Sequence, residues 1–195
     1  CSMRPFVENE DFELISNYDL VQSAHALLGG IDLDVASSDK ANCYVGADAY
    51  YTPSMDGLNE QPWSDSIYLF PPGGTYFWQH KMQRWKKTRS ASVTLTSSQA
   101  VWFRRMYREW MKGNIKQGVF MTNHPDMIRH DQRIFDFPIC ILKHAPMMIK
   151  NTSQGVDERK QTSTTIIVYM PPHGLNTENI EKFIEIYSEK GRIIC

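Results

Sequence analysis

Two aspartates have positions in the sequence from which a carboxylate could bind a ligand. Asp34 lies near the end of the apolar run 31–35, and Asp56 lies in a polar stretch ahead of Trp63. Carboxylates at the carboxyl ends of parallel strands can accept hydrogen bonds from ammonium and hydroxyl groups. Both residues also suit local turns, because Asp34 can cap the turn after it and Asp56 can form a type I turn with Gly57. The residue types alone leave both interpretations open.

A serine and a proline-rich tetrapeptide also have local interpretations. Ser16 precedes a segment with helical spacing that starts near Tyr18, so its hydroxyl can serve as the N-cap. The sequence Pro71-Pro72-Gly73-Gly74 follows an apolar run and is typical of a turn between a strand and a helix. On these residues alone, neither segment requires a role in binding or catalysis.

Basic side chains gather in two neighbouring segments and could contact the phosphate backbone of DNA or RNA. The candidate nucleic-acid-binding residues are Lys81, Arg84, Lys86, Lys87, Arg104 and Arg105, with Arg89 and Arg108 beside them. Solvated helix faces have the same composition, and the net charge of the chain is −1, so such binding would need a local patch. Trp102, Tyr107 and Trp110 have a spacing typical of helix packing, and base stacking would require that they be exposed.

Other kinds of site have little support. Histidines His124, His130, His144 and His173 show no consistent ligand spacing, and nearby Asp126 and Asp131 suit a solvated loop, so we predict no metal site. The four cysteines form no C-x-x-C pair. The sequence contains no G-x-S-x-G, P-loop or G-x-G-x-x-G motif, which leaves hydrolase, nucleoside triphosphatase and dinucleotide oxidoreductase activities unsupported.

Length and composition fit an ordinary globular protein. A chain of 195 residues with 42% hydrophobic and 22% charged residues predicts one domain over residues 4–195, with residues 1–3 interpreted as an extension outside the native segment. No apolar run approaches the roughly 18 residues that span a bilayer, and the first residues do not have the layout of a secretory signal. We therefore expect a soluble, intracellular protein, cytoplasmic or nuclear.

Apolar runs alternate with segments of helical spacing. The predicted strands are 31–35, 66–70, 91–96, 118–122, 137–142 and 164–170, with a last strand at 192–195. The predicted helices are 18–28, 76–87, 97–112 and 177–190, and the polar stretch 150–165 is predicted to be a mobile loop. Continuous apolar strands alternating with helices predict an α/β, Rossmann-like fold, in which a mostly parallel sheet has helices on both faces.

A series of short motifs between Phe12 and Trp78 occurs in a recognisable order. They are Glu13, Ser16-Asn17, Leu33-Asp34-Val35-Ala36-Ser37, Ala41-Asn42, Tyr51-Thr52, Asp56-Gly57-Leu58, Trp63 and Phe70-Pro71-Pro72-Gly73. In order and spacing they resemble the phage-type, Dam-like DNA adenine-N6 methyltransferases. The segments 164–171 and 183–191 are similar to the closing strand and last helix of that family.

The resemblance implies a Rossmann-like fold that binds S-adenosylmethionine. It assigns cofactor contacts to Ser16, Asp34, Ala36 and Asp56, with Ser16 replacing the family's threonine near the methionine end. In the family, the tetrapeptide begins with Asn or Asp, whose side-chain oxygen and the next carbonyl accept hydrogen bonds from the target amine. The aromatic residue at its end stacks on the flipped adenine.

The tetrapeptide of this chain departs from that pattern at both ends. Phe70 can accept no hydrogen bond, and removing one such acceptor typically slows catalysis by about 10² to 10³-fold. Gly73 removes the stacking ring, although Tyr76 or Phe77 could supply another from the next turn. Among the predicted catalytic positions Phe70, Pro71, Pro72 and Gly73, the carbonyl of Pro71 is the acceptor that remains.

Three hypotheses follow. The first is a methyltransferase-fold protein that has lost methyl transfer and acts as a binding, scaffolding or regulatory domain, with DNA, RNA or a protein as its partner. The second is an active S-adenosylmethionine-dependent adenine methyltransferase that uses a shifted acceptor. The third is a partner-binding module whose crevice is closed by aromatic side chains such as Phe70 and Tyr76.

Overall fold

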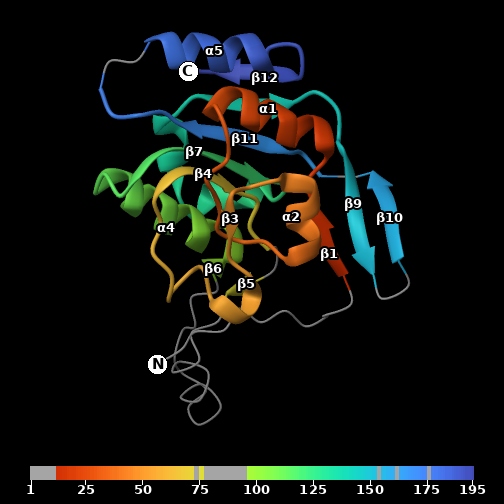
Figure 1. Cartoon of the computed structure of the whole chain (residues 1–195). Helices are drawn as coiled ribbons and strands as arrows, with labels where there is room; N and C mark the ends of the chain where they lie inside the picture. The colour runs from red at the N-terminus through yellow and green to blue at the C-terminus, as the bar shows by residue number, and fades with distance from the viewer. Residues whose placement is uncertain (1–11, 73–74, 77–95, 153–154, 161–162, 175–176) are drawn as a thin grey trace, which may run out of the picture.

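A seven-stranded sheet forms the centre of the molecule. The computed structural model describes residues 12–72, 75–76, 96–152, 155–160, 163–174 and 177–195 (Figure 1). The strand order is β12 (Gly191–Ile194), β8 (Ile139–Leu142), β11 (Ile166–Met170), β7 (Ile115–Thr122), β4 (Asp65–Leu69), β2 (Leu33–Asp34) and β3 (Ala49–Tyr50). The inner strands are almost wholly buried, as expected for strands covered on both faces.

The sheet is mixed, so the expectation of a mostly parallel sheet is corrected. β2 pairs in parallel with both β3 and β4, and β4 pairs in parallel with β7. The three remaining pairings, β7 with β11, β11 with β8 and β8 with β12, are antiparallel. The described residues between β8 and β11 form a strand hairpin and no helix, whereas a parallel return to a neighbouring strand requires a crossover connection.

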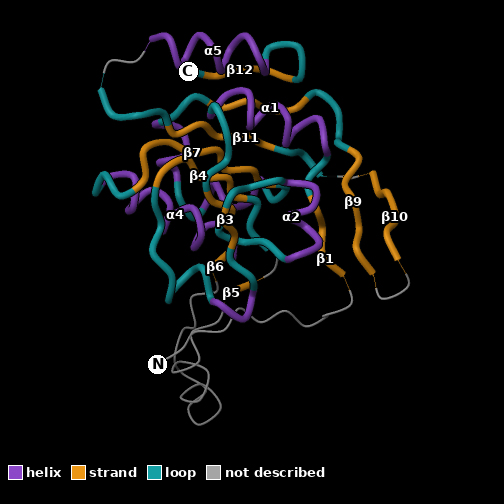
Figure 2. Tube along the Cα trace, viewed as in Figure 1, coloured by secondary structure: helices purple, strands orange, loops and turns teal. Residues whose placement is uncertain are grey.

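Helices cover both faces of this sheet. On one face α1 (Tyr18–Leu28) contacts both α5 (Thr177–Tyr187) and α2 (Asp39–Val45), as Figure 2 shows, and they bury Val21, Leu27 and Phe183 against it. On the other face lies α4 (Ser98–Met111), which packs Phe103 and Met106 against β7 together with the 3-10 helices η2 (Pro125–Arg129) and η3 (Gln132–Asp136). The predicted α/β class is therefore correct. Within the described ranges, no helix is long and apolar enough to cross a membrane.

Most of the predicted elements are confirmed where the structure describes them. Helix α1 has the predicted bounds, but its N-cap is Asn17, whose side chain accepts a hydrogen bond from the Asp19 amide at 2.9 Å, and not Ser16. Helix α1 ends at Gly29, which takes a left-handed conformation with φ 76°. The observed bounds differ from the predicted ones by at most two residues at each end for α4 and for strands β2, β4, β8, β11 and β12. Strand β7 begins three residues earlier than predicted, and helix α5 ends three residues earlier.

Several local predictions are wrong. The stretch 150–165 is no loop, because β9 (Met147–Thr152) and β10 (Gly155–Lys160) form an antiparallel hairpin that continues onto β1 (Phe12–Ile15). Tyr76 does not begin a helix, since β5 (Thr75–Tyr76) pairs with β6 (Thr96–Ser97). The rest of the predicted helix 76–87 and nearly all of the predicted strand 91–96 lie outside the described residues. The sequence also missed α2, β1, β3 and the 3-10 helix η1 (Pro53–Met55).

A buried carboxylate fastens the crossover after β7 to helix α4. The Asp131 side chain is 4% exposed and accepts hydrogen bonds from Arg133 Nε at 2.8 Å and from Arg104 Nε at 3.2 Å. Arg104 also donates to the carbonyl of His130 at 2.5 Å. Burial raises the pKa of Asp131, but the hydrogen bonds and charge of Arg133 outweigh it, so the pKa lies below its usual value. Asp131 is thus an ionised carboxylate held between two guanidinium groups.

We expect Asp131→Asn to lower the free energy of unfolding by about 2 kcal/mol at neutral pH, since hydrogen bonds to charged groups contribute this much. Because the folded pKa is depressed, the contribution is present above the unfolded pKa of about 3.9 and is lost as the pH falls through the folded pKa. Urea denaturation of the two proteins between pH 7 and pH 3 measures this. Asp126→Asn, at an exposed position in η2, is the control. A constant difference across this pH range would contradict the assignment.

Candidate functional site

One small cavity lies at the carboxyl ends of β2 and β4. Its wall is formed by eight residues: Ile15, Ser16, Asp34, Ala36, Ala41, Val45, Tyr68 and Phe70. The chain passes from β2 to β3 on one side of β2 and then returns to β4 on its other side. This reversal is a topological switch point, and ligands of open α/β sheets bind outside the carboxyl ends of the strands at such points. The cavity therefore has the position expected of a binding site.

Four residues predicted from the sequence meet in this cavity. Ser16, Asp34 and Ala36 are residues that the resemblance assigns to the cofactor, and Phe70 is the first residue of the degenerate tetrapeptide. They come from three separate segments: the end of β1, the end of β2 and the residue after β4. Ala41 and Val45, on α2, close the opposite wall. The sequence pattern includes Ala41 in the Ala41-Asn42 motif, but it does not predict α2 and does not single out Val45.

Asp34 has the predicted capping role and also lies in the wall of the cavity. The residue is 3% exposed, lines the cavity, and accepts a hydrogen bond from the Ala36 amide at 3.1 Å through Oδ1. It therefore caps the turn after β2 and also presents a carboxylate to the cavity wall. A buried carboxylate in this place can accept hydrogen bonds from a ligand's hydroxyl or ammonium group.

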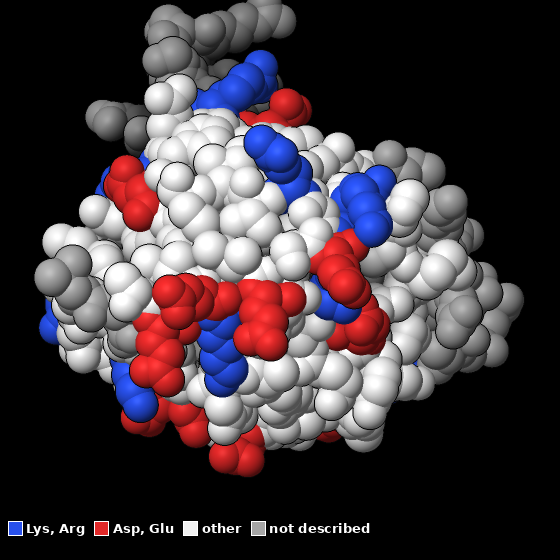
Figure 3. Space-filling model, turned by 90° about the horizontal axis from the view of Figure 1, so that it is seen from above, with Lys and Arg blue, Asp and Glu red and all other residues white. Residues whose placement is uncertain are grey.

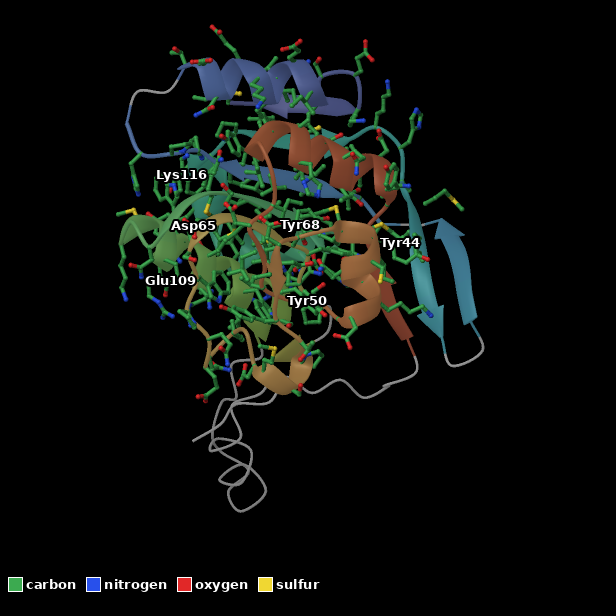
Figure 4. The ribbon with its side chains drawn as sticks, in the orientation of Figure 1. Tyr44, Tyr50, Asp65, Tyr68, Glu109 and Lys116 are labelled. Carbon is green, nitrogen blue, oxygen red and sulfur yellow. The ribbon has the colours of Figure 1, made fainter. Side chains whose placement is uncertain are left out.

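Tyr68 adds a hydroxyl group to the site. It lies in the interior (Figure 4), is 2% exposed, and its phenol donates to Ser16 Oγ at 2.5 Å. Burial raises the pKa of Tyr68 strongly, the hydrogen bond with Ser16 lowers it somewhat, and the charge of Asp34 raises it further. The phenol is therefore a neutral donor at physiological pH. The sequence pattern predicts Tyr68 in a core strand and does not assign it to a site.

Asp56 is not among the residues that line the cavity. Its backbone is left-handed, with φ 50°, and its carboxylate accepts hydrogen bonds from the side-chain amide of Asn59 at 3.0 and 3.1 Å. Asp56 therefore forms a local turn, which is the second of the two roles that its sequence position allows. The next residue explains the close fit of the loop, because a Cβ on Gly57 would lie 2.2 Å from the Val35 carbonyl oxygen. Trp63 Nε1 donates to the Gly57 carbonyl at 2.7 Å and holds the loop there.

The tetrapeptide is engaged in a buried polar network. Pro71 is buried, and its carbonyl accepts a hydrogen bond from Gln99 Nε2 at 3.1 Å. Gln99 is 1% exposed and also contacts Asn123 Oδ1 at 3.2 Å and the hydroxyl of Thr122. The one acceptor that the tetrapeptide retains for a target amine thus has a protein partner already. Gly73 and Phe77 lie outside the described residues.

Of the predicted basic residues, the two that the structure describes, Arg104 and Arg105, do not line the cavity. Arg105 is held by the protein, since it donates to the carbonyls of Leu58 and Gln61, pairs with Glu109 at 2.8 Å, and lies over the ring of Trp63. Its side chain is 14% exposed, so it has little access to a phosphate. Arg104 binds Asp131 but is 41% exposed. Lys81, Arg84, Lys86, Lys87 and Arg89 lie outside the described residues.

The cavity is far smaller than a nucleoside. Its volume is about 20 Å³, enough for one water molecule, whereas pockets for small-molecule ligands measure roughly 300–1,000 Å³. Ser16 and Asp34 have the polar groups that S-adenosylmethionine needs, but the cofactor does not fit with the side chains in this arrangement. In the described part of the chain, no three His, Cys, Asp or Glu side chains gather as metal ligands would.

Comparison with known proteins adds no relative. No protein-family model, curated protein or solved structure matches the chain.

Gln99→Met tests the network around Pro71. Methionine has nearly the same length but no hydrogen-bonding amide, so the Pro71 carbonyl and the Thr122 hydroxyl lose a partner within the core. We expect a decrease of about 2 kcal/mol in the free energy of unfolding, measured by chemical denaturation. Gln22→Met, at an exposed position in α1, is the matched control and should change little. Equal effects of the two substitutions would show that the network does not stabilise the fold.

Proposed function

We propose that this chain is a methyltransferase-like α/β domain that transfers no methyl group to adenine and acts as a binding or scaffolding domain. The main support is that residues assigned to a cofactor from separate sequence motifs, Ser16, Asp34 and Ala36, line one cavity at the switch point of the sheet. Motif spacing and topology are independent observations, and they lead to the same place in the molecule.

The sheet order also supports a methyltransferase-like fold. Strand β11 is antiparallel to its two neighbours, β7 and β8, which run in the same direction as each other. The resemblance implies a Rossmann-like fold, and a mixed sheet with helices on both faces is consistent with such a fold in general. Because this is a likeness of fold alone, it supports the architecture and not an activity.

The single observation that carries the absence of methyl transfer is the position of Phe70. This side chain lines the same water-sized cavity as Asp34, in the place where the resemblance puts an Asn or Asp acceptor. A phenyl ring cannot draw the lone pair of a target amine out of conjugation. The carbonyl of Pro71 already accepts a hydrogen bond from Gln99, so one acceptor of the family pattern is missing and the other is shared with the core network. Binding without catalysis is the role that these contacts favour.

Calorimetry and a transfer assay test this proposal together. We expect the purified chain to show no adenine methylation of DNA or RNA with isotope-labelled S-adenosylmethionine. We also expect weak or absent binding of S-adenosylmethionine and S-adenosylhomocysteine. Methylation that is abolished by Asp34→Asn and retained in the matched variant Asp56→Asn would overturn the proposal and establish an active enzyme.

The substitution Phe70→Ala tests what closes the cavity. Removing the ring enlarges the space beside Asp34, so we expect S-adenosylhomocysteine to bind at least about tenfold more tightly, corresponding to about 1.4 kcal/mol. Phe135→Ala, which removes an exposed phenyl ring from η3, is the control. If Phe70→Ala binds no better than the control, Phe70 is not the residue that excludes the cofactor.

A further inference from the structure

We infer that the outer face of α4, with the η2–η3 crossover and His173, binds single-stranded nucleic acid. This surface lies on the face of the sheet opposite α1 and α5, and it shares no residue with the cavity. The inference gives a partner to the proposed binding role, and it does not depend on whether the cavity accepts a cofactor.

The two buried acids of this face, Asp131 and Glu109, each lie beside two arginines, while Asp126 and Asp136 of the crossover are exposed. Asp131, 4% exposed, lies between Arg104 and Arg133, which are 41% and 44% exposed. Glu109, 7% exposed, pairs with Arg105 at 2.8 Å and lies 3.5 Å from Arg108, which is 57% exposed. Each buried carboxylate thus has two guanidinium groups, and the charge of exposed Asp136 also acts on Arg133. Lys112 at the end of α4 is also exposed.

Aromatic rings support two flat polar groups on the same face. The guanidinium of Arg133 lies over the ring of Tyr107, 4.4 Å from its centroid. The imidazole of His173 stacks on Trp110 with centroids 4.0 Å apart and an interplanar angle of 27°. Tyr107 and Trp110 are neighbours, with centroids 6.4 Å apart. Guanidinium and imidazole planes are surfaces on which unpaired bases stack.

Backbone contacts hold the second of these groups in place. The His173 ring is exposed, and its Nε2 lies 2.6 Å from the Trp110 carbonyl oxygen. Trp110 Nε1 donates to the Pro171 carbonyl at 2.7 Å. Since the imidazole is already fixed against the indole, stacking a base on it costs little further conformational entropy.

The side of the molecule that carries α5 is negatively charged. Acidic side chains gather on the side that carries α5 (Figure 3), where Glu178, Glu181, Glu185 and Glu189 are exposed. Two lysines there have protein partners, since Lys182 donates to the Leu27 carbonyl and Lys190 pairs with Asp19 at 2.6 Å. Among the described residues, the α4 face exposes four basic side chains (Arg108, Lys112, Arg129 and Arg133) against Asp126 and Asp136, so this face is more basic than the α5 side and favours binding of a polyanion.

Alternating positive and stackable groups fit an unpaired strand better than a duplex. In a duplex the faces of the bases are covered by their neighbours, so only phosphates would be available to this face. A single strand can place phosphates on Arg104, Arg108 and Lys112 and bases on Arg133 and His173. Such binding is tolerant of sequence, because every base has a stacking face.

Fluorescence anisotropy with labelled dT20, rU20 and a 20-base-pair DNA duplex, at several salt concentrations, tests the inference. We expect both single strands to bind more tightly than the duplex. Arg108→Ala/Lys112→Ala should reduce the salt slope of log K by about 0.7 for each phosphate that the protein no longer neutralises. His173→Ala should weaken binding by about fivefold or more with an unchanged slope, because it removes stacking. Lys143→Ala/Lys182→Ala removes the same charge on the α5 side and should have little effect.

Three results would overturn the inference. They are tighter binding of the duplex, equal weakening in the α4-face variant and the α5-side control, and equal binding of polyglutamate, which would indicate a surface for acidic protein segments. Thermal denaturation of each variant verifies that it is folded. The measurement contains no S-adenosylmethionine, so its failure is distinct from failure of the proposed loss of methyl transfer.

Discussion

Strand β2 has two residues, and its pairing with β3 and β4 decides where the cavity residues Asp34 and Tyr68 lie. Leu33 lies opposite Ala49 on one side and Ile67 on the other, and Asp34 lies between Tyr50 and Tyr68. Bonds beyond the strand extend this register, since Tyr51 N donates to Asp34 O at 2.9 Å and Ser66 N to an Asp32 carboxylate oxygen at 2.9 Å. With the register fixed, the Asp34 carboxylate and the Tyr68 phenol must lie side by side at the same edge of the sheet.

The parts of this fold that sequence could predict are those with a strong local signal. The helix 18–28 has an apolar face and a glycine at its end, and the strand 166–170 is apolar throughout. The hairpin of β9 and β10 has no such signal, because it pairs mainly with β1, apart from the main sheet, and its residues are largely polar. Strand direction was equally hidden, since apolar character shows that a strand is buried and not which way it runs.

The site also contains residues that the sequence could predict and contacts that it could not. Ser16, Asp34, Ala36 and Phe70 are predictable because motif order relates segments that are distant in sequence, and the cavity brings them together. Asp56 had equal support in sequence, yet its carboxylate serves a turn with Asn59. The partners of a polar side chain are decided by tertiary contacts: Gln99 meets Pro71 and Asn123 across separate elements. No spacing rule relates these three positions, so sequence reasoning could not foresee that the Pro71 carbonyl is engaged.

Strand β11 has a consequence for how the protein is made. It fills the place between β7 and β8, although it is synthesised more than forty residues after β7 ends, at Thr122 and Ile166 respectively. Until Ile166–Met170 leaves the ribosome, β7 has an open edge of unpaired amides and carbonyls along an apolar strand. Such edges pair readily with other chains. Pairing with β11 is therefore the step that closes this edge of β7.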